Sequence, residues 1–334
     1  MKQKYNQRYP LRSVVNYALI RLCKLLKTNQ VIGYPSKIHI EPTNICNLKC
    51  PLCPTGMGVL NRPKGSMGFE KFKQIVDEIK PYTTEMLFAG YGEPFLNKDI
   101  FRMTKYAADS GITVSVFTNA LMVDKIEKIH NLLKSGITDL TVSIDGTTQE
   151  TYEKYRVGSN LTKVLENIKS IIEEKKVLNL LKPYVRFQIV VTSINEIEVE
   201  DSRKLAMKLG ADSHFIKTAN LLLVTPPPYD ELPNIIEKYY PKEKKFRRYA
   251  RPKKDVNSCS MLYKEAFICW NGDVLSCCYD TFGLNFMGNI FNECSFYNVW
   301  NGEKYRILRK QVNNDIRTAL PLCYMCPNRF EFDF

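Results

Sequence analysis

Three cysteines, spaced as Cys-x3-Cys-x2-Cys, are the residues of this chain most able to do chemistry: Cys46, Cys50 and Cys53. Three thiolates this close in sequence can bind three irons of a 4Fe–4S cluster and leave the fourth iron open to a small molecule. The next cysteine is Cys259, so the segment lacks a fourth ferredoxin-type ligand and the second cysteine pair or histidines of a usual zinc site. We therefore predict an iron–sulfur cluster with one open iron, and structural zinc remains the alternative.

The composition places this site in a globular protein with room for one large domain and one smaller domain. The chain has 334 residues, and we find no apolar segment of the ~20 residues that a membrane-spanning helix needs. Eleven cysteines in a long chain without a recognisable signal peptide indicate metal ligation in a reducing cytoplasm. The net charge of +13 favours an anionic partner.

The cysteines follow the first of six alternating strand-like and helix-like segments. We expect strands at 38–41, 86–89, 113–117, 140–144, 185–191 and 215–217, and helices at 69–79, 99–109, 125–133, 161–174 and 199–209. This alternation predicts an α/β fold in which parallel strands and right-handed crossovers build a partial (β/α)6 TIM-like barrel. The cysteine loop then lies at the carboxyl ends of the strands, where barrels of this kind place their active sites.

Four further segments, in order and each after an expected strand, make residues 37–218 resemble the radical S-adenosylmethionine (radical SAM) superfamily. They are Gly90-Tyr91-Gly92-Glu93-Pro94, Thr118-Asn119-Ala120, Ser143-Ile144-Asp145-Gly146 and the segment that ends at Arg156. The resemblance implies that the open iron binds S-adenosylmethionine, which is cleaved to methionine and a 5′-deoxyadenosyl radical. Tyr91 departs from the glycine that is usual in the family.

The resemblance also implies which residues hold S-adenosylmethionine. The Gly-Glu-Pro segment would bind the methionine amino group, the Ser-x-Asp-Gly segment would lie near the ribose and carboxylate, and an arginine would pair with the carboxylate. The implied cofactor-binding residues are Leu52, Gly92, Glu93, Pro94, Asn119, Ser143, Asp145 and Arg156.

The cysteines near the carboxyl terminus resemble a truncated form of the SPASM extension of radical SAM enzymes, often called twitch. This resemblance implies one auxiliary 4Fe–4S cluster with four ligands: Cys259, Cys277, Cys323 and Cys326. Replacement of one ligand by Cys269 or Cys278, or a zinc ion in place of the cluster, stays open. A hairpin with Asn271-Gly272 at its turn would present Cys277. Cys23 and Cys294 are expected to be buried apolar residues.

Together these features predict four segments. Residues 1–36 form an amino-terminal helical extension, 37–225 the barrel, 226–254 a basic linker and 255–334 the auxiliary-cluster domain. Residues 242–254 carry a net charge of +7, which we interpret as a solvated linker, with binding of nucleic acid or a phosphorylated substrate as the alternative.

Residues 11–27 show apolar side chains at helical spacing, with basic residues between them. The apolar positions are Val15, Leu19, Leu22 and Leu26. We expect this face to pack under the barrel. The alternative is a helix on an anionic membrane, which would place the cytoplasmic protein at the inner face of the membrane.

The expected substrate is a small carbohydrate- or aminocyclitol-like molecule that is oxidised, epimerised or dehydrated. Lys217 and His214 are the candidate bases, and Cys278 is a candidate thiol, with Cys269 and Cys294 as alternatives. Maturation of a ribosomal peptide is the main alternative. RNA modification is a weaker one, because no appended RNA-binding domain is recognisable. A donor such as flavodoxin or ferredoxin would supply the electron.

Overall fold

The computed structural model describes most of the chain. The described residues are 10–221, 230, 232–247, 251–252, 259–293, 295–314, 320–324, 326 and 330–331. Cys294, the prolines at 226–228 and part of the basic segment 242–254 lie outside the described residues. The predicted segment boundaries near 225, 226, 254 and 255 also lie there and stay predictions.

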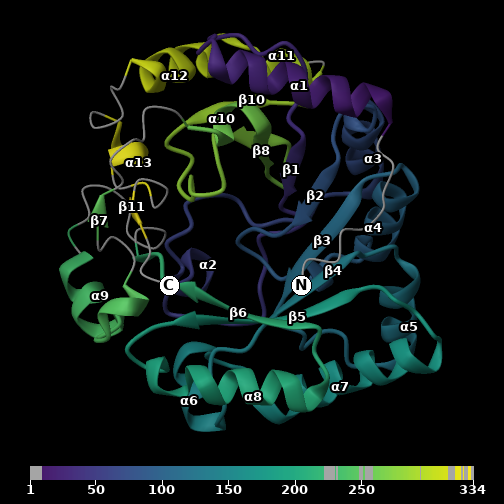
Figure 1. The fold of residues 1–334 in the computed structure, drawn as a ribbon, viewed down its shortest axis with the longest axis vertical. Coiled ribbons are helices and arrows are strands. Elements are labelled where there is room, and N and C mark those ends of the chain that lie inside the picture. Colours follow the sequence, from purple (N-terminus) through teal and green to yellow (C-terminus); the bar gives the residue numbers. More distant parts are fainter. Residues whose placement is uncertain are drawn as a thin grey trace.

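Six parallel strands follow one another in a curved sheet, as the alternating pattern predicted (Figure 1). They are β1 (Lys37–Ile40), β2 (Glu85–Phe88), β3 (Thr113–Thr118), β4 (Asp139–Ser143), β5 (Tyr184–Val191) and β6 (Ser213–Thr218). The expected strands overlap all six, with ends that differ by one or two residues. The α/β, TIM-like prediction is confirmed, and the sheet is open, since β6 and β10 (Phe286–Asn289) are its two edges.

Helices cover the outer face of this sheet because each carries an apolar stripe. They are α3 (Phe69–Ile79), α4 (Ile100–Asp109), α5 (Ile126–Lys134), α7 (Leu161–Val177) and α8 (Val199–Leu209). All five apolar residues that predicted the first of these helices are buried: Phe69, Phe72, Ile75, Val76 and Ile79. They pack in one core with the outward side chains Ile38 and Ile40 of β1. Full burial of each such side chain is worth about 1.5–3 kcal/mol.

The carboxy-terminal segment continues the same sheet beyond β1. Strand β8 (Glu265–Ile268) pairs in parallel with β1, and the antiparallel strands β9 (Asp273–Leu275) and β10 follow, which gives the order β10-β9-β8-β1-β2-β3-β4-β5-β6. The predicted hairpin at Asn271-Gly272 is therefore present between β8 and β9. The sequence did not predict the pairing of β8 with β1, because the two strands have four residues each and lie far apart along the chain.

Short elements complete the chain around the sheet. They are α2 (Pro54–Met57), α6 (Gln149–Tyr155), α9 (Leu232–Tyr239), α10 (Met261–Lys264), α11 (Phe296–Trp300), α12 (Glu303–Asn313), α13 (Pro321–Tyr324), β7 (Arg251–Pro252) and β11 (Phe330–Glu331). Among the described residues, no helix has the length and apolar content needed to cross a bilayer.

The amino-terminal helix α1 (Leu11–Leu25) forms as predicted, but it packs by the opposite face from the one expected. Its buried residues are Ser13, Asn16, Ile20 and Cys23. Of the four predicted apolar positions, 15, 22 and 26 are 49–65% exposed, and Leu19 is partly buried. The prediction that this face packs under the barrel is wrong for three of its four residues. On the buried face, Ile20 and Cys23 join the main core. Polar contacts add to this packing: Asn16 Nδ2 lies 2.9 Å from Tyr34 O, and Tyr34 N donates to Asn16 Oδ1.

Candidate functional site

The three amino-terminal cysteines, which we call the cysteine triad, lie in the loop between β1 and α3. Cys50 is buried, whereas Cys46 and Cys53 are partly exposed. Cys53 precedes α2, and its amide donates to Cys50 O at 3.2 Å. Lys49 N donates to Val157 O, which fixes the loop against the chain that follows α6. The loop therefore holds its thiols at the carboxyl end of β1, as the barrel rule predicted.

Burial favours the protonated form of two of these thiols. Burial, with smaller contributions from nearby Glu93 and the other two thiols, raises the pKa of Cys46 to about 12. Burial likewise raises the pKa of Cys50, while the Arg156 guanidinium lowers it. Loading iron would therefore release protons. Thiolates are the ligands of iron–sulfur clusters, so the donor set of the triad fits such a cluster.

A buried ion pair lies directly against the triad. Arg156 Nε donates to Asp145 Oδ2 at 2.5 Å, and Arg156 Nη1 lies 3.8 Å from Cys50 Sγ. Asp145 is fully buried, and its other oxygen accepts from Val190 N. Two sequence-predicted residues are thus brought together beside a triad cysteine, and the guanidinium retains groups to bind an anion.

Glu93 is held at the centre of a second buried network. Its carboxylate accepts from Thr118 Oγ1 at 2.7 Å and from Asn119 N at 2.8 Å. Burial raises the pKa of Glu93, whereas these hydrogen bonds lower it. Asn119 Nδ2 in turn donates to Asn47 Oδ1 in the cysteine loop. The network joins the ends of β2 and β3 to the cysteine loop.

Gly92 lies in the loop that follows β2, where this loop passes close to the cysteine loop. A β carbon there would overlap Thr43 O and lie 2.8 Å from Ile45 O. Glycine is therefore required by close approach of backbone. Pro94 begins the short helix η1 (Pro94–Leu96) and is buried.

The remaining predicted cofactor residues also lie at this edge. Ser143 ends β4 and is buried, and Leu52 packs beside Ala219, Leu221, Ile235 and Tyr239. Within the described ranges, no three histidine, cysteine or carboxylate side chains converge closely enough to hold a single metal ion.

The sequence did not single out a bidentate pair at the carboxyl end of β1. Arg62 donates to both carboxylate oxygens of the fully buried Glu41, at 2.9 Å and 2.8 Å. Tyr91 N also donates to Glu41. One feature of the sequence could have predicted this pair. Glu41 is an acidic residue at the end of a strand that carries Ile38 and Ile40.

Tyr91, the departure from the family pattern, has a defined contact. Its hydroxyl donates to Cys278 O at 3.2 Å and lies 2.6 Å from Thr281 Oγ1. The Thr55 hydroxyl donates to Tyr91 O from the other side. Tyr91 therefore joins the amino-terminal cysteine loop to the loop that carries Cys277 and Cys278.

The four expected auxiliary ligands, which we call the carboxy-terminal set, come from separate segments: Cys259, Cys277, Cys323 and Cys326. Cys326 N donates to Cys323 O at 3.2 Å. Burial raises the pKa of Cys277 far above its usual range, and the nearby Cys259 and Cys326 are among the groups that raise it further. This proximity favours Cys277 as the ligand, and the assignment stays a prediction.

The two alternative ligands pack in or against a cluster with Tyr91, Phe267 and Leu275. Burial raises the pKa of Cys269, and its charged neighbours include Glu41 and Arg62. Burial also raises the pKa of Cys278 to about 12, and Glu265, Lys217 and Lys37 are its charged neighbours. Lys217 on β6 is exposed, and Cys278 follows β9 in the other half of the sheet, so these two predicted residues come from separate parts of the fold.

His214, the other candidate base, is also on β6. Its Nε2 lies 3.1 Å from Ser202 Oγ on α8, so the ring faces the outer helices. Alternation along β6 places Lys217 on the opposite face. The prediction that His214 reaches a substrate is therefore not supported by its placement.

His39 lies on the inner face of the sheet, a placement that the sequence did not predict. Its neighbours Ile38 and Ile40 face the outer core, and His39 Nε2 lies 2.9 Å from Glu265 Oε2 on β8. Burial would raise the pKa of Glu265, but the hydrogen bond and charge of His39, with the charges of Lys37 and Lys264, lower it to about 2. This pair couples β1 to β8 on the inner face.

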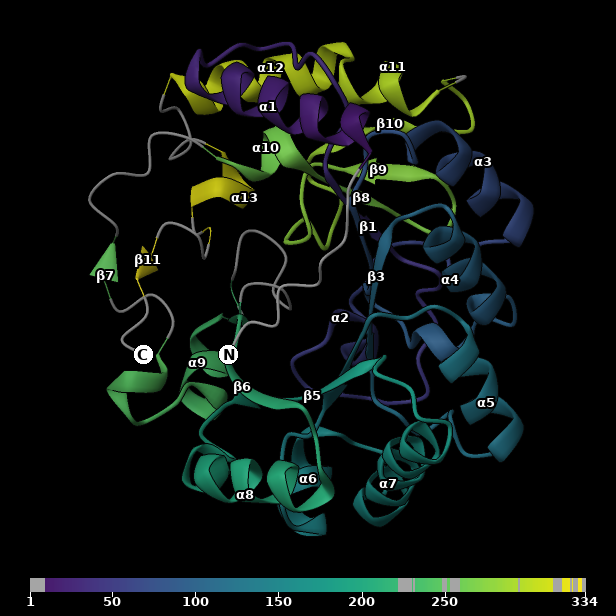
Figure 2. The same cartoon turned by 45° about the vertical axis from the view of Figure 1, so that its right-hand side comes forward.

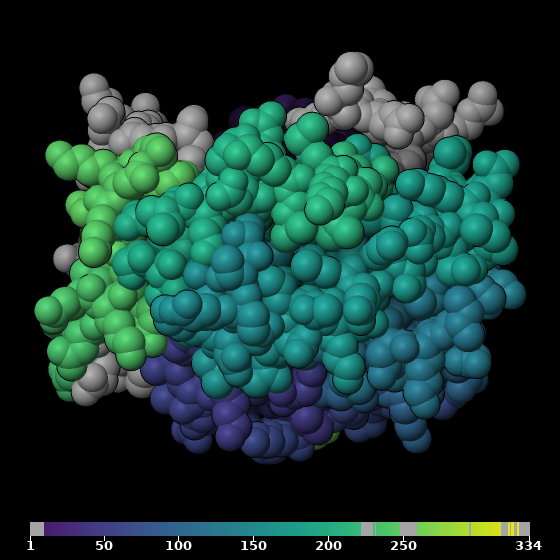
Figure 3. Space-filling model, turned by 90° about the horizontal axis from the view of Figure 1, so that it is seen from below, coloured from purple at the N-terminus to yellow at the C-terminus, as the bar shows by residue number. Residues whose placement is uncertain are grey.

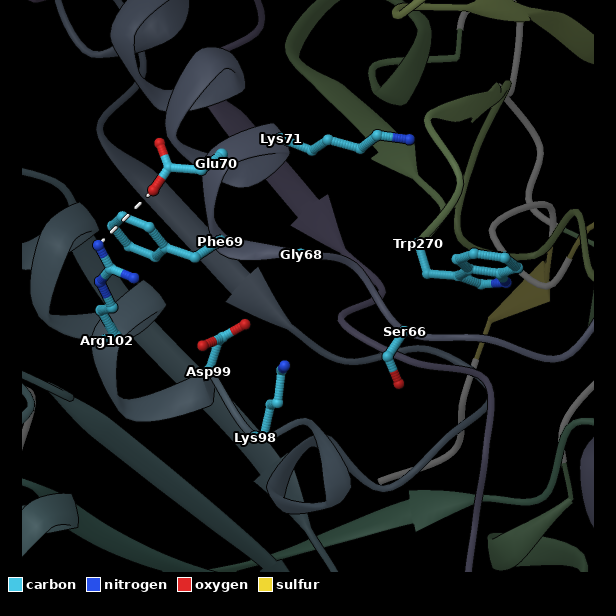
Figure 4. Close-up of a pocket in the computed structure, with 9 residues that line it drawn as sticks. All are labelled: Ser66, Gly68, Phe69, Glu70, Lys71, Lys98, Asp99, Arg102 and Trp270. Carbon is cyan, nitrogen blue, oxygen red and sulfur yellow. Dashed lines mark ion pairs between the residues drawn. The ribbon is translucent and has the colours of Figure 1, made fainter.

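A pocket of about 460 Å³ lies beside the loop that follows the triad (Figure 4). Trp270, Phe69 and Ser66 line it, together with the basic side chains of Lys71, Lys98 and Arg102. Arg102 pairs with Glu70 at 3.6 Å and lies over the Phe69 ring. None of the predicted cofactor residues lines this pocket, so it is separate from the triad.

Two family models match the chain. The radical SAM superfamily matches residues 40–206, which is half of the chain, and the iron–sulfur cluster-binding SPASM domain matches residues 259–327. These ranges contain the triad and the carboxy-terminal set, respectively. A radical SAM fold with a second iron–sulfur segment is therefore shown, and the cofactors that both domains imply are 4Fe–4S clusters and S-adenosylmethionine.

Curated relatives agree with this family. The chain is 30% identical over 184 residues to the AdoMet-dependent heme synthase of Methanosarcina barkeri, which covers 54% of this chain and 50% of that protein. It is 24% identical over 329 residues to the tungsten-containing aldehyde ferredoxin oxidoreductase cofactor-modifying protein of Pyrococcus furiosus, covering 89% and 88%. The chain thus spans half the length of the first relative and most of the second.

Solved structures show the same fold. SuiB of Streptococcus suis bound to S-adenosylmethionine has a TM-score of 0.65 at 18% identity, covering 92% of this chain and 75% of SuiB. BtrN in complex with AdoMet and 2-DOIA has a TM-score of 0.52 at 17% identity, covering 87% and 92%. At this identity the likeness concerns the fold alone.

Proposed function

We propose that this chain, which belongs to the radical SAM superfamily, oxidises or epimerises a small polar substrate, carbohydrate- or aminocyclitol-like, on the inner face of its open barrel. The observation that carries the proposal is the arrangement of the cysteine triad directly beside the buried Arg156–Asp145 pair and the Glu93 network. When bound, the clusters and S-adenosylmethionine supply a hydrogen-abstracting 5′-deoxyadenosyl radical and an electron acceptor.

The chain's own residues would bind and orient S-adenosylmethionine at the strand ends. Arg156 offers guanidinium groups to an anionic carboxylate, because Asp145 occupies its Nε and fixes the plane of the fork. Glu93 and Asn119 present polar groups in a buried site, where a hydrogen bond is stronger than in water. Gly92 leaves room for the backbone contact. These roles follow from the family resemblance and fit the geometry.

The inner face offers groups for the step that follows hydrogen abstraction. The charge of Lys217 is among those that lower the pKa of Cys278, and the His39–Glu265 pair adds a second proton-transfer group. A base that takes the proton from a substrate hydroxyl yields oxidation, whereas a thiol that returns a hydrogen to the opposite face yields epimerisation. Lys217 is the candidate for the first outcome and Cys278 for the second.

Several features favour a polar substrate on this face. The buried Gln188 Oε1, next to Ser143 across β4 and β5, has no hydrogen-bond partner among the described residues. A buried acceptor of this kind needs a donor, and a hydroxyl or amine of a bound molecule provides one. BtrN, whose fold is similar, was solved with 2-DOIA. The proposal also includes a low-potential electron donor, such as flavodoxin or ferredoxin, that reduces the cluster.

A peptide substrate is the second candidate. Relatives include a PqqA peptide cyclase of Bradyrhizobium diazoefficiens and the mycofactocin maturase MftC, and SuiB was also solved bound to its precursor peptide SuiA. The open sheet, with edges at β6 and β10, leaves the inner face accessible from the side.

The test measures 5′-deoxyadenosine after anaerobic reduction with S-adenosylmethionine, alone and with each of two probes, 2-DOIA and the peptide SuiA. We expect basal release by the wild type, none by Cys50→Ala, and stimulation by the small probe. Stimulation by SuiA alone would favour the peptide candidate, and no basal release would overturn the proposal.

Two variants then distinguish the proposed role of the base from that of the thiol. Lys217→Gln should abolish oxidised product while 5′-deoxyadenosine is still formed, and Cys278→Ala should do the same for an epimerised product. Lys204→Gln, an exposed lysine of α8, is the matched control and should leave turnover unchanged. Equal product from wild type and Lys217→Gln would remove Lys217 from the assignment.

A further inference from the structure

The helix α1 presents an apolar face to solvent that no described element covers. Its exposed apolar residues are Leu11, Val14, Val15, Ala18, Leu22, Leu25 and, at the helix end, Leu26. At about 100° per residue these positions occupy one arc of about 120°. Leu11 and Leu25 are 78% and 77% exposed, values unusual for leucine in a folded chain.

The orientation of α1 is fixed by the opposite face, on which Ile20 and Cys23 join the main core and Ser13 and Asn16 make buried hydrogen bonds. Asn16 Nδ2 donates to Tyr34 O and Tyr82 O, and Asn16 Oδ1 accepts from Tyr34 N. Ser13 Oγ donates to Pro81 O. Gly33 has a φ of +122° and lies so close that a β carbon would overlap Asn16 Oδ1. Because its buried polar partners lie on this face, α1 cannot turn its apolar arc inward without breaking these bonds.

Basic residues border the apolar arc on both sides. On the helical wheel Arg21 lies beside Val14 at one edge, and Arg12 lies beyond Leu26 at the other. The first 36 residues contain no aspartate or glutamate, and their seven basic residues are Lys2, Lys4, Arg8, Arg12, Arg21, Lys24 and Lys27. An apolar arc bordered by cations is complementary to a surface that is negative outside and apolar inside.

We propose that the outward face of α1 docks on an anionic phospholipid surface. The helix would lie in the plane of the interface, with its leucines about 5–10 Å deep and its arginines at the headgroups. The helix α12 lies beside α1 in both views and exposes Ile307 with Arg306 and Lys310 (Figures 1 and 2). The docking surface would thus extend over two helices of the same layer.

A second copy of the chain fits this face less well. A two-fold contact would place the arc of one copy against the arc of the other, and so bring arginines and lysines together without an acidic partner in this segment. A lipid surface supplies the missing negative charge, with each basic residue near it worth about a fivefold gain in affinity.

The experiment is cosedimentation of the full-length holoprotein with vesicles. Two compositions are compared: phosphatidylcholine alone, and equal parts of phosphatidylcholine and phosphatidylglycerol. We expect binding to the second and little to the first, with loss of binding as salt rises and screens the charges. Absence of binding to the anionic vesicles would overturn the proposal.

Two variants test the two parts of the surface. Leu22→Ser/Leu25→Ser should weaken binding by about tenfold or more, because apolar area leaves the interface. Arg21→Gln/Lys24→Gln should weaken it by about fivefold per charge. Both pairs are on α1, outside the proposed catalytic site, so release of 5′-deoxyadenosine in solution should not change.

The matched controls are on the opposite side of the molecule, where α6–α8 form the surface (Figure 3). Val177→Ser/Met207→Ser removes apolar side chains that are 76% and 71% exposed, and should bind as the wild type does. Equal weakening by this control would overturn the assignment to α1. So would a wild-type dimer in analytical ultracentrifugation that Leu22→Ser/Leu25→Ser converts to a monomer, since a second copy would then occupy the face.

Discussion

The cysteine triad and the carboxy-terminal set are two thiol sites built in different ways. The triad lies in one loop of eight residues, and the ends of neighbouring parallel strands supply its surroundings: Glu93, Asn119, Asp145 and Arg156. The carboxy-terminal set gathers cysteines from three separate segments, and the sheet joins it to the barrel through β8 and β1. One site depends on local spacing, and the other on pairing between distant strands.

This difference explains why the sequence was informative about one site and less so about the other. The residues around the triad follow strands of a regular α/β pattern, so their meeting at one edge is a consequence of parallel topology. The carboxy-terminal set depends on the pairing of β8 with β1, and no local sequence pattern specifies that pairing. Among the described residues, the His39–Glu265 pair and the Tyr91 hydroxyl are two of the side-chain contacts between the parts of the chain that carry these sites.

The largest expected effect concerns the triad. Arg156→Met would leave Asp145 buried without its partner, which we expect to lower the free energy of unfolding by about 3–5 kcal/mol. Binding of S-adenosylmethionine should fall with it, as followed by equilibrium dialysis. Arg203→Met, which breaks an exposed pair with Glu200, is the control and should cost about 0–1 kcal/mol. Equal stability of the two variants would mean that the pair does not hold the site together.

The next largest effect concerns the His39–Glu265 pair, which connects β1 to β8. The carboxylate of Glu265 has its pKa lowered from 4.5 to about 2, so its stabilising contribution is present above pH 4.5 and is lost as the pH falls towards 2. Glu265→Gln should therefore unfold about 3 kcal/mol more easily at neutral pH, at about 1.4 kcal/mol per pKa unit. The difference from the wild type should vanish towards pH 2, in urea titrations of iron-free protein. A difference that is constant with pH would show that the His39 contact is not its source.

The smallest effect concerns Tyr91. Tyr91→Phe removes the hydroxyl that contacts Cys278 O and Thr281, at an expected cost of about 0.5–1.5 kcal/mol. Because this contact reaches the loop of Cys277, the EPR signal of the second cluster should also shift. Tyr184→Phe, which loses an exposed hydroxyl contact of the same length to Asp212 O, should leave that signal unchanged. An unchanged signal in Tyr91→Phe would mean that the two sites are not connected by this residue.

The sequence predicted the parts of the fold that follow from periodicity. The five apolar residues of α3 predicted its buried face correctly, because only one face of that helix is apolar. The same reasoning was wrong for most of α1, where an apolar stripe is exposed and the buried face consists of Ser13, Asn16, Ile20 and Cys23. Hydrogen-bond partners in distant loops determine that orientation. The spacing of residues along one helix carries no information about these partners.

Single side chains show the same limit. The placement of Asp145 and Arg156 was expected from the family resemblance, and the geometry agrees with it. His214 was expected near a substrate but faces α8, because a histidine in a short strand can take either face and β6 sets the alternation. Arg62 was not recognised, since only the fold brings its loop over Glu41.

The most direct test of the central claim, that the chain holds two separate clusters, is anaerobic iron counting with EPR. It compares the reconstituted wild type with a Cys46→Ala/Cys50→Ala/Cys53→Ala variant. We predict that the variant keeps about four irons and a 4Fe–4S signal that S-adenosylmethionine does not change. A variant that holds no iron, or holds zinc, would contradict the account, since the carboxy-terminal set would then be structural and could not accept an electron from the substrate.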